Sequence, residues 1–139
     1  DDINKWLKPD GWSRESRIIN TKRAAHVAKL LLKHNISVCV SVISPYNESR
    51  KAAREIINDD RFIETYIKCQ LQVCESRDVK GMYKKARSGE IINFTGVNGE
   101  YEIPSKPDLV IDTENHSPHE NVTEIMQYLK ARKLISAAN

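Results

Sequence analysis

An apolar run at residues 36–43, ISVCVSVI, restricts the possible folds of this chain more than any other stretch. The run is short, mostly β-branched and free of charge, and it directly follows a segment with helical periodicity. Strands of this composition are typical of parallel sheets, in which both faces of the strand are covered. We therefore predict a buried strand over residues 36–43, which ends at the Ser44-Pro45-Tyr46 turn.

Helical and extended segments alternate along the rest of the chain. Ser13 is placed to cap a helix that continues to about residue 34, where apolar residues recur at helical spacing. We predict further helices at residues 47–58, 71–76 and 118–133, the last capped by Ser117, and further strands at residues 62–67 and 109–111. This order predicts the α/β class, as a three-layer α/β/α sandwich with a parallel sheet, and one domain over residues 1–139.

Composition excludes several classes of protein. With 40% hydrophobic and 29% charged residues the chain has the balance of a soluble globular domain, and a net charge of +3 is too small to indicate nucleic-acid binding. We expect neither a signal peptide nor a membrane span, since no apolar run approaches the ~20 residues that a bilayer requires. Neither the three cysteines nor the four histidines show metal-ligand spacing, so we expect reduced thiols, no metal site and a cytoplasmic location.

A basic, glycine-punctuated stretch occupies residues 77–96, RDVKGMYKKARSGEIINFTG. Five lysines and arginines outweigh Asp78 and Glu90 there, and three glycines leave the backbone free to reorganise. Such a stretch fits a mobile flap that closes over a phosphorylated ligand. Its composition fits a solvated basic helix about equally well.

The ends of the predicted strands indicate where a ligand would bind. In open α/β sheets the ligand site lies beyond the carboxyl ends of the strands. Residues 43–46, 69–80 and 112–115 each follow a predicted strand. We therefore expect these segments to meet at one crevice, with the basic stretch above it.

Together, these motifs resemble the adenylylsulfate (APS) kinases, which phosphorylate the 3′-hydroxyl of APS with ATP. The resemblance implies a P-loop NTPase-like kinase fold and makes residues 77–104 the lid region. Nearly the whole chain carries it, in the order of the family, through Gly11-Trp12-Ser13, Arg17, Asn20, Lys22, Arg23, Ile43-Ser44-Pro45-Tyr46, Arg50, Arg61-Phe62-Ile63-Glu64, Val73-Cys74-Glu75, the lid with Asn93-Phe94-Thr95-Gly96, and Asp112-Thr113-Glu114-Asn115.

On the APS side, the resemblance implies roles for residues from three parts of the chain. Trp12 and Phe94 would sandwich the adenine of APS, because aromatic faces stack on a base. Arg17 would bind the phosphosulfate with its guanidinium fork. Asn20 would hydrogen-bond the same nucleotide, and backbone groups of Ile43 and Ser44 would border its pocket.

The resemblance also assigns residues to the transfer step and to ATP. Lys80 would bring positive charge to the transferring phosphate, and Asp1 would lie near the attacking hydroxyl and the Mg²⁺ ion. Ser44 matches a serine proposed in the family to become a phosphoserine, although direct in-line transfer needs only positioning and charge neutralisation. Arg77 and Thr113 would lie near the adenine of ATP.

Taken one at a time, these residues have ordinary structural explanations. Trp12 and Phe94 also fit half-buried aromatics, Arg17 with Asn20 fits a solvated helix face, and Lys80 fits an exposed lysine. Ser44 and the Asp112-Thr113 pair also fit residues of simple turns. Their shared order and spacing favour the functional interpretation.

The sequence departs from the family pattern at its beginning. No Gly-Lys pair occurs, so the P-loop that would hold the ATP phosphates and Mg²⁺ is absent from residues 1–139. We expect the chain to start inside the family's D-G-D-x-x-R motif, with Asp1 as its second Asp and Asn4 in place of a substrate-binding Arg. Other differences are Ser16 for a common Asp and Lys68-Cys69-Gln70 for the usual Asp-Thr-Pro.

These departures leave more than one functional hypothesis open. The first is an APS kinase that uses ATP and Mg²⁺, of which this chain is an incomplete and by itself inactive part. The alternative is a nucleotide-binding pseudoenzyme or regulatory module without a P-loop, and a third is a kinase of another small nucleotide or sulfated metabolite. The expected partners are APS and ATP, without nucleic acid or membrane. A homodimer and a fusion to or association with ATP sulfurylase are compatible with the family.

Overall fold

A computed structural model describes residues 13–135 of the chain. The described residues form two compact units, each built from segments that are separate in the sequence. The first contains residues 13–62 and 79–103, and the second contains residues 63–78 and 104–135. Each unit is described by itself below.

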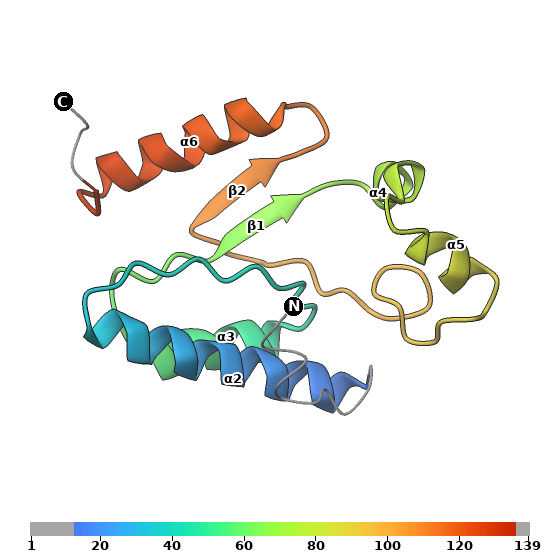
Figure 1. The fold of residues 1–139 in the computed structure, drawn as a ribbon, viewed down its shortest axis with the longest axis horizontal. Coiled ribbons are helices and arrows are strands. Elements are labelled where there is room, and N and C mark those ends of the chain that lie inside the picture. Colours follow the sequence, from blue (N-terminus) through green and yellow to red (C-terminus); the bar gives the residue numbers. More distant parts are fainter. Residues whose placement is uncertain (1–12, 136–139) are drawn as a thin grey trace. The chain divides into compact units, whose positions relative to one another are not determined.

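Two helices form the centre of the first unit. Helix α2 (Arg14–Lys33) begins as the sequence predicts, because the Ser13 side chain caps it by accepting a hydrogen bond of 3.1 Å from the backbone N–H of Ser16. Helix α3 (Asn47–Ile57) ends at Asn58, which adopts the left-handed conformation at φ +48°. The two helices pack on each other (Figure 1) around a small core made of Ala25, Ala28 and Ile57, against which Leu32, Val38, Ala53, Ile56 and Phe62 are partly buried.

The predicted strand at residues 36–43 is wrong for the described part of the chain. These residues lie in no helix or strand, and Ile36, Val40, Val42 and Ile43 are each between 44% and 58% exposed. A strand requires a neighbouring backbone that pairs with its N–H and C=O groups, and apolar, β-branched composition cannot supply one. Val38 alone of the run contributes to the helical core.

The basic stretch folds into a short helix followed by turns. Helix α5 (Met82–Arg87) starts after Gly81, which has φ +65°. Beyond it, Thr95 and Gly99 form an isolated parallel bridge that closes a tight loop. Residues 79–103 therefore have defined structure within the first unit.

The second unit contains the parallel strand pair. Strand β1 (Thr65–Lys68) pairs in parallel with β2 (Leu109–Asp112), in a register that runs from Thr65 opposite Leu109 to Lys68 opposite Asp112. Helix α4 (Leu71–Arg77) follows β1, and helix α6 (Pro118–Ala131) follows β2 and packs against it (Figure 1). Ser117 caps α6 in a capping box with Glu120, as the sequence predicts.

The α/β class with parallel strands is thus confirmed. The predicted helices at residues 13–34, 47–58, 71–76 and 118–133 all form, with ends that differ by at most a few residues. Strand β1 begins three residues later than the sequence predicts, because Phe62 packs on the helical core of the first unit instead. Within residues 13–135, no helix is long and apolar enough to traverse a bilayer.

Candidate functional site

Ser44 lies in a loop whose conformation is fixed by α3. Its backbone adopts φ +41°, and its carbonyl oxygen accepts a hydrogen bond of 2.6 Å from Nη1 of Arg50. The Ser44 hydroxyl lies 3.2 Å from the Oγ atom of Ser49, which is fully buried and donates to the Tyr46 carbonyl at 2.7 Å. Ser44 is therefore held by residues of α3, and the side chain of Ile43, the other predicted site residue of this loop, is exposed.

Arg17 lies in the first turns of α2 and contacts the segment that carries Phe94. Its Nη2 atom donates a hydrogen bond of 2.8 Å to the carbonyl oxygen of Asn93. Partial burial lowers the pKa of the Arg17 guanidinium from its usual value, and the group remains a cation. Arg17, the residue predicted to bind the phosphosulfate, therefore contacts Asn93, which directly precedes the predicted base-stacking residue Phe94. Asn20, one turn further along α2, is half-buried and accepts a hydrogen bond of 3.3 Å from Nη1 of Arg23.

The Phe94 ring is oriented by a residue that the sequence did not single out. Tyr83 of α5 meets it edge-to-face, with ring centroids 5.0 Å apart and an angle of 80° between the planes. This is the preferred arrangement for a pair of aromatic rings. Tyr83 therefore links the helix of the lid region to the candidate stacking ring.

The loop after Phe94 is held by Asn98 and Gly99. Asn98 accepts a hydrogen bond from the Phe94 N–H at 2.6 Å and donates one to the Ile91 carbonyl at 2.9 Å. Gly99 approaches so closely that an added Cβ would lie 2.8 Å from the carbonyl carbon and oxygen of Asn93. The Asn-Gly pair is a turn signal in the sequence, but a turn signal does not indicate which backbone atoms the glycine will approach.

Lys80 is exposed directly before Gly81, at the start of the first unit's second segment. It precedes three further cations of the lid region, Lys84, Lys85 and Arg87. Clustered positive charge of this kind suits a polyanionic ligand.

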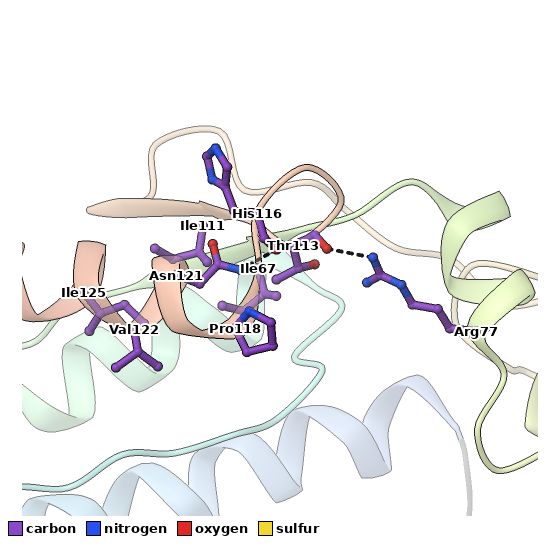
Figure 2. A pocket seen from close by; sticks show the side chains of 9 residues that line it. All are labelled: Ile67, Arg77, Ile111, Thr113, His116, Pro118, Asn121, Val122 and Ile125. Carbon is purple, nitrogen blue, oxygen red and sulfur yellow. Dashed lines mark hydrogen bonds between the residues drawn. The ribbon is translucent and has the colours of Figure 1, made fainter.

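In the second unit, Arg77 and Thr113 lie together at a pocket. Nη2 of Arg77 donates a hydrogen bond of 2.8 Å to the Thr113 carbonyl (Figure 2). Nη1 of Arg77 lies 3.9 Å from the Cys69 sulfur. The cavity has a volume of about 320 Å³, close to the lower limit for small-molecule sites. Apolar side chains form most of its wall, and the lining residues are Ile67, Arg77, Ile111, Thr113, His116, Pro118, Asn121, Val122 and Ile125.

The turn after β2 is fixed by the Asp112 carboxylate. It accepts hydrogen bonds from the Asn115 side chain at 2.9 Å, the Asn115 N–H at 3.1 Å and the Glu114 N–H at 2.9 Å. These bonds, first that of the Asn115 side chain, lower the pKa of Asp112 to about 2, and nearby Lys68 adds to the effect. The turn places Thr113 next to Lys68. The Lys68 carbonyl accepts hydrogen bonds from both the N–H and the hydroxyl of Thr113.

Some of the predicted site residues are not described. Asp1 and Trp12, together with Asn4, lie outside residues 13–135. Of the others, Arg17, Ser44 and Phe94 belong to the first unit, and Arg77 and Thr113 to the second.

No metal centre is found within the described part of the chain. Residues 13–135 contain no group of three His, Cys, Asp or Glu side chains that could hold a metal ion. Cys39, Cys69 and Cys74 are free thiols.

Comparison with known proteins identifies a family. The family model described as adenylylsulphate kinase matches residues 1–112. An adenylyl-sulfate kinase of Oceanobacillus iheyensis is 48% identical over 133 residues, which is 96% of this chain and 65% of the relative. One of Pseudomonas entomophila is 39% identical over 97% of this chain and 65% of its own length.

A solved structure agrees with these sequence matches. The APS kinase CysC of Mycobacterium tuberculosis, in complex with AMPPNP and APS, superposes with a TM-score of 0.86 at 38% identity and covers 94% of this chain and 76% of its own. The chain spans about 65% of the length of the curated relatives described above.

Proposed function

The chain belongs to the adenylylsulfate kinase family, and from that premise we propose that the protein transfers the γ-phosphoryl group of ATP to the 3′-hydroxyl of APS, giving 3′-phospho-APS and ADP. The match of the family model to residues 1–112 is the observation that carries the proposal. The similar kinase of M. tuberculosis, which binds both AMPPNP and APS, supports the same pair of nucleotides here.

APS would bind to residues of the first unit. Arg17 is suited to the phosphosulfate, since a partly buried guanidinium forms strong charge-assisted hydrogen bonds to oxyanions. Phe94 would stack on the adenine, with Trp12 on the opposite face, and the contact of Arg17 with the neighbouring Asn93 carbonyl supports this pairing. Asn20 would hydrogen-bond the nucleotide, and backbone groups at Ile43 and Ser44 would border it.

ATP would place its adenine at the pocket of the second unit. The Arg77 guanidinium and the Thr113 main chain form its polar edge, and apolar side chains form the rest, as is usual for a base site. Lys80 would neutralise charge on the transferring phosphoryl group, which needs little covalent chemistry from the protein.

Ser44 and Asp1 complete the proposed catalytic group. The Ser44 hydroxyl is 3.2 Å from Ser49, and this supports a positioning role in a direct in-line transfer. Asp1 would lie near the attacking hydroxyl. Mg²⁺ usually binds with substrate phosphates, and we assign it none of residues 13–135, which lack a group of suitable ligands.

The cellular setting is part of the proposal. We place the activity in the cytoplasm, where its three cysteines would stay reduced. A homodimer and an association with ATP sulfurylase are further proposals, which the mass in solution and co-purification would test.

An assay of the full-length protein with Mg-ATP tests the function. We expect APS to be converted to 3′-phospho-APS with stoichiometric ADP, and AMP to be a poor acceptor because it lacks the sulfate that Arg17 would bind. Failure to form 3′-phospho-APS would contradict the proposal. Tight APS binding without turnover would favour the nucleotide-binding module instead.

A further inference from the structure

Glu102 lies near the end of the lid region, and it contacts the Ser44 loop (residues 43–46) through its backbone and the first residue of α3 through its side chain. Its N–H donates to the Pro45 carbonyl at 2.8 Å, and its carbonyl accepts from Nη2 of Arg50 at 2.6 Å. Its carboxylate accepts from the Asn47 N–H at 2.7 Å and from both terminal nitrogens of Arg14 at 3.2 Å. One residue therefore connects the lid region to α2, to α3 and to the loop before α3.

The charges in this cluster depend on one another. Arg50 is only 8% exposed, and a buried guanidinium is stable only when its donors are paired. Its two terminal nitrogens, Nη1 and Nη2, donate to the carbonyls of Ser44 and Glu102 and to the side-chain oxygen of Asn47, and the buried Nε makes no hydrogen bond within residues 13–135. The Glu102 carboxylate also lies at the N-terminus of α3, where a negative charge is favourable.

The same contacts fix the backbone of Ser44. Its φ of +41° is unusual for a residue with a side chain and persists only where neighbours hold it. Arg50 binds the Ser44 carbonyl, and Glu102 holds the adjacent Pro45 carbonyl and the α3 N-terminus. Arg14, which Glu102 holds, lies 4.0 Å over the Tyr46 ring.

We propose that Glu102 is a positioning residue for APS, which couples the lid region to the Ser44 loop without touching the substrate. The identity of the substrate, APS, rests on the proposed function. The coupling between the lid region and the Ser44 loop rests on the geometry alone. Loss of the carboxylate would leave the α3 N-terminus uncapped and allow the loop to shift, and displacements of about 1 Å in a site can cost a hundredfold in rate.

Glu100 provides a matched control two residues away. It also forms an ion pair with Arg14, at 3.3 Å, but its side chain is 67% exposed against 25% for Glu102. Within the described residues, only the Glu102 carboxylate caps Asn47. Glu102→Ala and Glu100→Ala therefore remove the same charge and the same type of ion pair, and they differ in the link to the loop.

Steady-state kinetics of the full-length protein give the first test. For Glu102→Ala we expect the KM for APS to rise roughly ten- to a hundredfold while the KM for ATP stays within about twofold. Glu102→Gln, which keeps one acceptor for the Asn47 N–H, should lie between it and the wild type, and Glu100→Ala should match the wild type. Equal effects of the two alanine variants, or equal rises in both KM values, would overturn the proposal.

Hydrogen exchange gives a second test that needs no turnover. In Glu102→Ala, amides at residues 46–50 should exchange faster than in the wild type and in Glu100→Ala. Unchanged exchange there would overturn the coupling. A wild-type protein that forms no 3′-phospho-APS would contradict the proposed function, and exchange would still decide whether Glu102 holds the loop.

Discussion

At the scale of single residues, the carbonyl of Asn93 is confined from two directions. It accepts the hydrogen bond of Arg17 at 2.8 Å, and the Cα of Gly99 approaches it so closely that no Cβ fits. The contact is with backbone atoms, which cannot rotate away as a side chain could. The residue at position 99 therefore determines where the Asn93 carbonyl, the hydrogen-bond partner of Arg17, can lie.

Gly99→Ala should disturb this arrangement. The new Cβ would force the Asn93 carbonyl to move by a few tenths of an ångström or more, because contacts of 2.8 Å are not tolerated. We expect APS affinity to fall by about 1–3 kcal/mol, measured by calorimetry. Val97→Ala, in the same loop, should bind APS like the wild type, and equal affinities for all three proteins would contradict the argument.

Phe94→Ala should weaken APS binding by ~1–3 kcal/mol, which is the typical loss for one base stack. The substitution removes the Phe94 ring, which Tyr83 contacts edge-to-face. Calorimetric titration with APS measures the change. Ile92→Ala serves as the control, because the Ile92 side chain is aliphatic and 71% exposed, and equal losses in the two variants would remove Phe94 from the proposed site.

Residue patterns predicted the helix caps correctly. They did not predict contacts between residues that are far apart in the sequence. Ser13 and Ser117 were both predicted as caps, because a cap bonds within three residues of itself. Tyr83, Asn98 and Glu102 were not predicted as supporting residues. Glu102, for example, bonds to Asn47 across 55 positions, and such a contact depends on the path of the chain rather than on a local pattern.

At the scale of elements, the turn after β2 should respond to pH through Asp112. Its folded pKa of about 2 lies below the ordinary value near 3.9, so the ionised form is favoured by folding. The resulting stability is fully present above about pH 4 and is lost as the pH falls towards 2.

Asp112→Asn tests this effect. The variant should have a lower unfolding temperature than the wild type at pH 6, and the difference should shrink towards pH 2, as followed by circular dichroism. Glu124→Gln on α6 is the control for loss of a carboxylate that accepts no hydrogen bond within residues 13–135, and it should change the unfolding temperature little. A difference for Asp112→Asn that stays constant with pH would contradict the assignment.

The run at residues 36–43 marks the limit of prediction for elements. Its composition predicted a buried strand that does not form, because strand formation depends on a pairing partner that composition does not encode. Residues 109–111 are similar in composition, and they do form a strand because β1 pairs with them in register.

At the scale of the whole molecule, the predicted APS residues and the predicted ATP residues fall in different compact units. Arg17, Ser44 and Phe94 belong to the first unit, and Arg77 and Thr113 to the second. Only the family resemblance predicted that one set of residues binds APS and the other binds ATP. Taken individually, these residues also fit ordinary surface positions.

Arg17→Ala and Arg77→Ala should therefore affect different substrates. We expect the first to raise the KM for APS and the second the KM for ATP, each about ten- to a hundredfold, from the loss of hydrogen bonds that involve a charged donor. Arg132→Ala, at the end of α6, is the control for loss of an exposed cation. Full kinetic analysis of the three variants measures both constants, and a rise of both KM values in either site variant would contradict the division.

The bond between Arg17 and Asn93 has a consequence for how sequences of this family can diverge. Because the acceptor is a peptide oxygen, every amino acid at position 93 offers the same atom, so this hydrogen bond by itself selects no particular side chain there. Selection can act on the bond only through the arginine and through the small residue at position 99. This bond alone therefore gives no reason for the side chains at positions 17 and 93 to covary between relatives.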